Sequence, residues 1–204
     1  IAKINKNIKL PDADIVPVVR SESSGTTFNF TSYLSKANED WAKNYGAAKT
    51  INWGAKVTPA QGNPLVAKTI KQTPNSIGYI EYAYKVTENL NAATLKTANG
   101  DWAEPTEENF AKAALNSNFS IDEHFYDVLA YGKGEKSYPI AAATFILLPS
   151  DNAEDGKKVT KFFKWAFEND EAKKAAANLG YLPLPKDTVD MIEEYWKKYD
   201  IFPK

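Results

Sequence analysis

The sequence contains no cysteine and only one histidine in 204 residues. The absence of cysteine excludes disulfide bonds and thiol chemistry, and it fits exported bacterial proteins as well as many cytosolic ones. The single histidine, His124, stands close to acidic residues, but a zinc site would need further ligands grouped around it. No Gly-x-Ser-x-Gly motif supplies a serine nucleophile either. We therefore expect no metal-binding or catalytic role for His124.

The sequence also lacks an excess of basic residues and a long apolar run. The 25 Lys and Arg residues balance 26 Asp and Glu residues, so the electrostatic signature of nucleic-acid binding is missing. The longest apolar stretch, near residues 141–148, is much shorter than the roughly 18–20 residues of a membrane-spanning helix. Apolar residues make up 43% and aromatic residues 13% of the chain, which indicates a globular protein.

A strand, a short polar loop and a helix are predicted around Arg20. The apolar residues 15–19 are typical of a short strand, and Pro17 favours a position at the edge of a sheet. Small polar residues fill positions 21–27. A helical pattern then continues to about Asn44, with Gly46 as its stop signal. This arrangement places an arginine at the point where the strand ends.

The same segment suits an anion. The first N–H groups of a helix lack intrahelical partners, and the helix dipole adds partial positive charge there. Ser24, Gly25 and Thr26 stand where these groups are expected. Gly25 allows close approach of a ligand, and the two hydroxyls add donors. Arg20 supplies a planar fork that matches two oxygens of a tetrahedral oxyanion.

Glu22 has two possible roles beside such an anion. It pairs with Arg20 and fixes the guanidinium, or it accepts a proton from a protonated oxyanion. Spacing alone also allows Ser24, Thr26 and Thr27 to be simple helix caps, because Ser and Thr are common at that position. No Gly-Lys-Ser/Thr follows Gly25, so the loop is not a Walker motif.

Strand and helix patterns alternate along the rest of the chain, which predicts an α/β architecture with largely parallel sheets. Strands are expected at residues 51–53, at 77–82 and, as a buried strand, at 138–148. Asn99-Gly100 predicts a hairpin turn. Helices are expected from Gly62, with Leu65 facing inward, from Thr106, which caps the acidic pair Glu107 and Glu108, and from residues 155, 171 and 187. In the helix at 155–169, the apolar side is expected to include Phe162.

The segment Arg20-Ser-Glu-Ser-Ser-Gly-Thr-Thr-Phe-Asn-Phe-Thr-Ser-Tyr-Leu34 closely resembles the phosphate-binding segment of the periplasmic phosphate-binding proteins of bacterial phosphate ABC transporters. Further matching motifs run nearly to the end of the chain: Gly62-Asn63, Gln72-Thr-Pro-Asn-Ser-Ile-Gly-Tyr-Ile-Glu-Tyr-Ala-Tyr84, Pro105-Thr-Glu-Glu-Asn-Phe-Ala111, Tyr138-Pro-Ile140, Thr144-Phe-Ile-Leu147 and Phe162-Phe-Lys-Trp-Ala166. Two departures are Glu22, where the family usually has Asp, and fewer glycines at residues 54–64.

The resemblance implies a two-lobed type II ("Venus flytrap") periplasmic-binding-protein fold, of which this chain is the C-terminal portion. Residues 1–137 are expected to form most of the anion-binding lobe, incomplete at its start. Residues 138–204 are expected to form the hinge return strand and the C-terminal helices that pack on the other lobe. The family's N-terminal part is absent from this chain, which begins at Ile1 without a signal peptide. That part carries further phosphate ligands, including the carboxylate that takes the phosphate proton.

The function implied is the capture of inorganic phosphate and its delivery to the membrane permease of an ABC importer, in the periplasm or, in a Gram-positive organism, as a cell-surface lipoprotein. Arg20, Ser24, Gly25 and Thr26 are the expected phosphate ligands, with Glu22 supporting Arg20. No enzymatic reaction, cofactor, metal or nucleic-acid partner is expected. The expected partners are phosphate, the permease, and the missing N-terminal segment or a chain supplying it. Alternatives are another tetrahedral oxyanion such as sulfate, a phosphatase-like enzyme, or a structural role with a vestigial site.

Overall fold

The computed structural model describes residues 1–148 and 152–203. Its N-terminal elements are η1 (Ala2–Ile4), β1 (Val16–Arg20), α1 (Gly25–Ala37), α2 (Glu39–Asn44), β2 (Thr58–Ala60), α3 (Gly62–Gln72), β3 (Ser76–Gly78) and α4 (Tyr82–Thr87). The later elements are β4 (Leu95–Lys96), β5 (Trp102–Ala103), α5 (Glu107–Leu115), α6 (Ala153–Glu168), α7 (Asp170–Asn178) and α8 (Lys186–Lys198). None of the described helices is both long enough and apolar enough to cross a bilayer.

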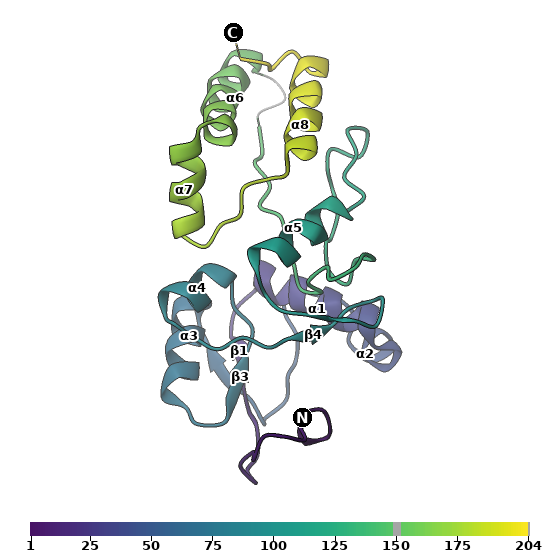
Figure 1. The fold of residues 1–204 in the computed structure, drawn as a ribbon, viewed down its shortest axis with the longest axis vertical. Coiled ribbons are helices and arrows are strands. Elements are labelled where there is room, and N and C mark those ends of the chain that lie inside the picture. The colour runs from purple at the N-terminus through teal and green to yellow at the C-terminus, as the bar shows by residue number, and fades with distance from the viewer. Residues whose placement is uncertain (149–151, 204) are drawn as a thin grey trace.

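A three-stranded parallel sheet, in the order β2-β1-β3, organises the N-terminal part of the chain (Figure 1). Arg20 at the end of β1 is level with Ala60 at the end of β2. In open α/β sheets, ligands bind outside the carboxyl ends of the parallel strands. The sheet therefore brings Arg20 and the residues after Ala60 to one edge, where a ligand is expected. The predicted α/β class with parallel pairing is confirmed.

Helix α3 covers one face of this sheet and forms a small core with it. Val18 and Val66 are fully buried, Ala60 is nearly so, and Ile70 and Ile80 pack around them. The prediction that Leu65 also faces inward is wrong, since its side chain is 45% exposed.

The middle strand contains Pro17, so the predicted edge position is wrong. Val16 donates its N–H toward β3, to the carbonyl oxygen of Asn75 at 3.0 Å. Because strand N–H groups alternate in direction, the N–H that Pro17 lacks would point toward β2. Pairing with β2 begins only at Val18, so the proline removes no bond from that ladder.

Several predicted boundaries also change. Asn38 adopts an extended conformation, ends α1 and caps α2 by accepting from the N–H of Trp41 at 2.7 Å, so two helices replace the single one predicted to Asn44. Residues 51–53 form no strand, and the strand of this region is β2. The strand predicted at 77–82 ends at Gly78, and Tyr82 begins α4. The hairpin at Gly100 is confirmed by the antiparallel pair β4–β5.

The strand predicted at residues 138–148 is wrong, because none of these residues forms a strand, and the predicted burial holds only at its start. Tyr138 and Ala141 are buried, but Phe145, Ile146 and Leu147 are 44%, 47% and 92% exposed and pair with no described strand. An apolar run forms a ladder only where a second strand supplies donors and acceptors, and no described residue does so here.

Helices α6, α7 and α8 gather at the end of the molecule opposite the N-terminus (Figure 1). Thr160 donates to the carbonyl oxygen of Ile201 at 2.6 Å, and Trp196, only 5% exposed, stacks with Phe167. Phe162 was predicted to lie on the apolar side of α6, but it is 57% exposed. The turn after α7 rests on α4, because a Cβ on Gly180 would lie 2.6 Å from the Cα of Ala83.

Candidate functional site

The arginine that ends β1 is held in place mainly by Glu22. The Nε of Arg20 donates to Oε1 of Glu22 at 2.7 Å, and Nη2 donates to the same oxygen. The side chain of Arg20 is only 12% exposed. On its other edge, Nη1 donates to Oγ1 of Thr26 at 3.2 Å and to Oδ1 of Asn63 at 3.1 Å. The contact between Arg20 and Glu22 expected from the sequence is present.

Glu22 is also bound by the start of a second helix. The backbone N–H of Gly62, the first residue of α3, donates to Oε1 of Glu22 at 3.0 Å. The hydrogen bonds from Arg20, opposed by desolvation and aided by backbone N–H groups including that of Gly62, lower the pKa of Glu22 to about 2. Such a carboxylate is too weak a base to take a proton from an oxyanion near neutral pH. The geometry favours the role in which Glu22 fixes Arg20.

Helix α1 begins at Gly25 and is capped by Ser24. Oγ of Ser24 accepts from the N–H of Thr27 at 3.2 Å, so the capping interpretation of Ser24 is confirmed. The backbone N–H of Ser24 donates to the carbonyl oxygen of Lys49 at 2.9 Å, which removes it as an anion donor. The hydroxyl proton of Ser24 is not used by the cap, because the oxygen acts there as an acceptor.

The N–H groups of Gly25 and Thr26 remain at the start of α1, where the helix supplies no acceptor for them. Gly25 is exposed, and a Cβ built on it would meet no heavy atom within 4 Å. The space that a side chain at Gly25 would occupy, beside its N–H group, is therefore open. Capping and anion binding are compatible here, since Ser24 serves the first while Gly25 and Thr26 are available for the second.

Three residues that were not singled out as site residues complete the surroundings of Arg20. Asn63, from the first turn of α3, contacts Arg20 and Thr26, and its Nδ2 donates to Oε2 of Glu81 at 3.4 Å. Tyr79 follows β3, and its hydroxyl contacts both Thr27 and the backbone N of Arg20. The signal available in the sequence was their presence in two of the motifs that carry the resemblance, Gly62-Asn63 and the segment 72–84.

The other sequence candidates lie apart from this loop. Nδ1 of His124 contacts the hydroxyl of Tyr195 at 2.7 Å. Glu108 pairs with Lys112 one turn further along α5, as expected for a structural pair. Among residues 1–148 and 152–203, no group of three or more acidic or histidine side chains is placed to hold a metal ion.

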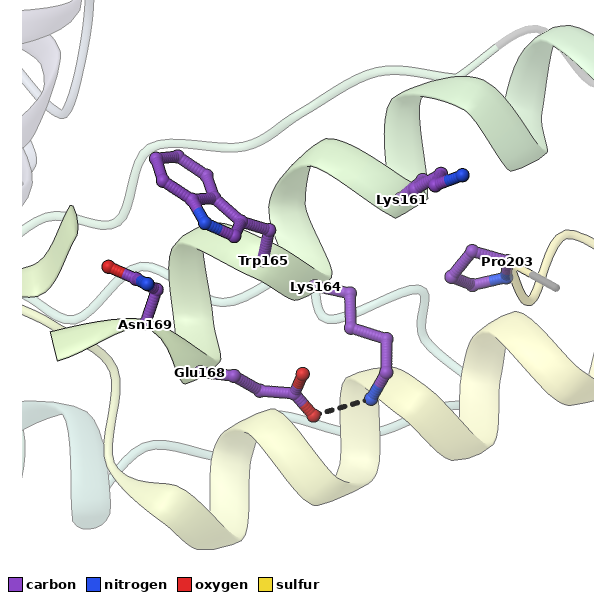
Figure 2. Close-up of a pocket in the computed structure, with 6 residues that line it drawn as sticks. All are labelled: Lys161, Lys164, Trp165, Glu168, Asn169 and Pro203. Atoms are coloured by element: carbon purple, nitrogen blue, oxygen red, sulfur yellow. Dashed lines mark hydrogen bonds and ion pairs between the residues drawn. The ribbon is translucent and has the colours of Figure 1, made fainter. Parts of the chain in front are cut away.

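A surface depression of about 510 Å³ lies beside α6, at the end of the molecule opposite the N-terminus (Figures 1 and 2). Lys161, Lys164, Trp165 and Glu168 line part of it. Lys164 is neutralised by Glu168 at 2.5 Å and by Glu193 at 2.6 Å. This depression therefore does not offer the concentrated positive charge that an anion site requires.

Comparison with known proteins gives a consistent result. A family model described as "PBP superfamily domain" matches residues 1–170. Over 96% of its length, the chain is 40% identical to phosphate-binding protein PstS of Xylella fastidiosa (strain Temecula1). Over 97% of its length, it is 39% identical to PstS of Haemophilus influenzae. The chain spans 54% and 59% of these two relatives.

The fold is similar to a solved structure titled as the high-affinity periplasmic phosphate-binding protein PfluDING bound with phosphate. The TM-score is 0.60 at 20% sequence identity, and the match covers 89% of this chain and 57% of the other. At this identity the likeness establishes the fold.

Proposed function

We propose that this chain, which belongs to the PBP superfamily, binds inorganic phosphate at the loop between β1 and α1 as the substrate-binding component of an ABC importer. The observation that carries the proposal is the guanidinium of Arg20, fixed by Glu22 beside the open N-terminus of α1. The PstS relatives, named as phosphate-binding proteins, support phosphate as the anion. We propose binding without chemical turnover.

The proposed ligands are Arg20, Ser24, Gly25 and Thr26, with Glu22 in support. The N–H groups of Gly25 and Thr26 point from a helix start, and the hydroxyls of Ser24 and Thr26 can rotate toward the same oxygen atoms. Arg20 offers the Nη2 N–H that its four bonds to Glu22, Thr26 and Asn63 do not use. Charge-assisted hydrogen bonds contribute roughly 1.5–3 kcal/mol each, so a few of them hold the ion without a metal.

We also propose a division into lobes. Residues 1–137 form the anion-binding lobe, and residues 138–204 form the return through the hinge and the helices that pack on the other lobe. The exposed apolar residues Phe145, Ile146 and Leu147 support this, since they are suited to a surface that another segment covers. That segment is supplied by the remainder of the relatives' length or by a separate chain, and the two lobes would close over phosphate, outside the cytoplasm, before docking on the permease.

The binding test is calorimetric titration with phosphate and sulfate near pH 7, with Arg20→Ala and the control Lys71→Ala. Lys71 pairs with Glu88 on the surface, so the control removes one positive charge elsewhere. We expect phosphate affinity to fall at least 100-fold in Arg20→Ala and to stay within two-fold in the control. Equal affinity for sulfate would identify a general oxyanion site. Absence of phosphate binding, both in this chain and in the chain joined to the first lobe of a PstS relative, would overturn the proposal.

The lobe proposal is tested with Leu147→Asp, because Leu147 is 92% exposed. The substitution should leave the Tm of this chain unchanged. It should lower the Tm of the chain joined to a first lobe, because a carboxylate would then be buried against apolar surface. An unchanged Tm in both proteins would contradict the proposed covering of this segment.

A further inference from the structure

Asn63 connects three charged or polar groups around the anion loop. Its Oδ1 accepts from Nη1 of Arg20 at 3.1 Å and from the hydroxyl of Thr26 at 3.5 Å. Its Nδ2 donates to Oε2 of Glu81 at 3.4 Å. Two of these partners, Arg20 and Thr26, are proposed phosphate ligands. Asn63, in the first turn of α3, is therefore in direct contact with two of the proposed phosphate ligands.

The orientation of the Asn63 amide follows from the chemistry of its partners. Arg20 has only donors, so the amide oxygen must face it. An ionised Glu81 has only acceptors, so the amide NH₂ must face Glu81. Both neighbours thus select the same one of the two amide orientations, which removes the usual ambiguity between oxygen and nitrogen.

The position of Asn63 on α3 ties it to Glu22. Gly62 adopts a φ of +70°, which favours glycine, and its N–H binds Glu22. The next residue, Asn63, binds Arg20. Two consecutive residues at the start of one helix therefore hold both members of the Arg20–Glu22 pair, and the guanidinium is fixed along both of its edges.

We propose that Asn63 is a positioning residue for phosphate binding, which acts by orienting the Arg20 guanidinium beside the N-terminus of α1. The inference rests on the proposed function. The neutrality of the amide is essential to it. A carboxylate at this place would accept the same hydrogen bonds, but it would offset the charge of Arg20, repel a phosphate dianion and face Glu81 with like charge. The neutral amide of Asn63 orients the guanidinium of Arg20 without offsetting its positive charge, so that charge remains available to attract the anion.

The test compares phosphate affinity of the wild type, Asn63→Ala and Asn63→Asp, with Lys71→Ala as control and Tm measured without phosphate. We expect Asn63→Ala to weaken phosphate binding about ten-fold, as one lost hydrogen bond to a charged group implies. Asn63→Asp should weaken it more at pH 8. That additional loss should persist as the pH falls to 5, because a carboxylate that accepts from Arg20 stays ionised over this range, as Glu22 does.

The mechanism is tested by repeating Asn63→Ala in an Arg20→Lys background. Lysine keeps the charge but has no planar fork to orient, so Asn63→Ala should then cost less than two-fold. An equal loss in both backgrounds would overturn positioning through Arg20, and affinity within two-fold of wild type for Asn63→Ala would overturn the inference as a whole. If the wild type binds phosphate neither alone nor when joined to the first lobe of a PstS relative, the proposed function itself is refuted. That result differs from phosphate binding that Asn63→Ala leaves unchanged, so the two failures are distinguishable.

Discussion

The hydroxyl of Tyr79 lies 2.8 Å from Oγ1 of Thr27, and it also accepts the backbone N–H of Arg20 at 3.2 Å. One phenol therefore connects the end of β1 to the first turn of α1, the two ends of the anion loop. Tyr79 is itself held by stacking on Phe30, with ring centroids 4.5 Å apart. The loop is thus anchored to Tyr79, which follows β3, and β3 lies on the other side of β1 from β2.

Tyr79→Phe should lower the free energy of unfolding by about 1–3 kcal/mol, because it leaves the N–H of Arg20 and the buried hydroxyl of Thr27 without this partner. Urea unfolding monitored by circular dichroism measures the change. Tyr126→Phe is a matched control, since Tyr126 is 71% exposed. Equal stability of both variants and the wild type would show that the phenol is not an anchor.

Gly25→Ala should leave the fold intact and weaken phosphate binding. A Cβ at Gly25 meets no heavy atom within 4 Å, so the substitution creates no clash. Because a helical Cβ tilts toward the N-terminus, the added methyl group should crowd an anion bound there. We expect an unchanged or slightly raised Tm and at least a ten-fold loss of phosphate affinity by calorimetry. Gly132→Ala is the control, because a Cβ there makes only ordinary contact at 3.6 Å. Full affinity in Gly25→Ala would place the anion elsewhere.

Gly78→Ala should destabilise the sheet. A Cβ at Gly78 would lie 2.8 Å from both the carbonyl oxygen of Val18 and Cδ1 of Ile70. The neighbouring strand cannot move without breaking its ladder, so the overpacking should cost about 1–3 kcal/mol. The Tm of Gly78→Ala is compared with that of Gly25→Ala. The added methyl group meets open space at Gly25 but meets the backbone of β1 at Gly78. Equal Tm values would contradict the packing described for α3 on β1 and β3.

Glu22 should make stability depend on pH in the acidic range. Its pKa is lowered from 4.5 to about 2, chiefly by the hydrogen bond from Arg20, so the folded protein binds this proton less readily than the unfolded chain does. The stabilisation is therefore complete above pH 4.5 and is lost as the pH falls toward 2. Allowing for solvent screening of a side chain that is 32% exposed, it amounts to about 1–3 kcal/mol.

Glu22→Gln is the matching variant, because it keeps the shape of the side chain and removes the titration. Urea unfolding of both proteins between pH 7 and pH 2 should show the difference in unfolding free energy shrinking as the pH falls from 4.5 to 2. A difference that is constant over this range would mean that the Arg20–Glu22 pair contributes nothing to stability.

Local chemistry along the chain was sufficient to predict several features. Ser24 and Thr106 are helix caps as expected, and Gly100 forms the expected hairpin turn. Each of these features depends on residues within a few positions of one another, so sequence patterns report them well. The contact of Arg20 with Glu22 belongs to the same class, since the two residues are separated by one position.

Other features depended on partners distant in the sequence. Pro17 is tolerated in the middle strand only because pairing with β2 begins one residue later. Residues 145–147 have the composition of a buried strand, yet they are exposed where no described strand pairs with them. The composition of a segment indicates its propensity to form a strand, whereas strand pairing also requires a second strand positioned next to it.

The sequence by itself determined the strand, the polar loop and the capped helix around Arg20, because these follow from short-range hydrogen bonding and backbone preferences. Only the tertiary structure decided that Asn63 and Tyr79 contact that arginine and that Glu81 binds Asn63. The physical reason is the parallel sheet. Its register sets β2 and β3 on either side of β1 with their carboxyl ends at one edge, so residues after three separate strands meet there.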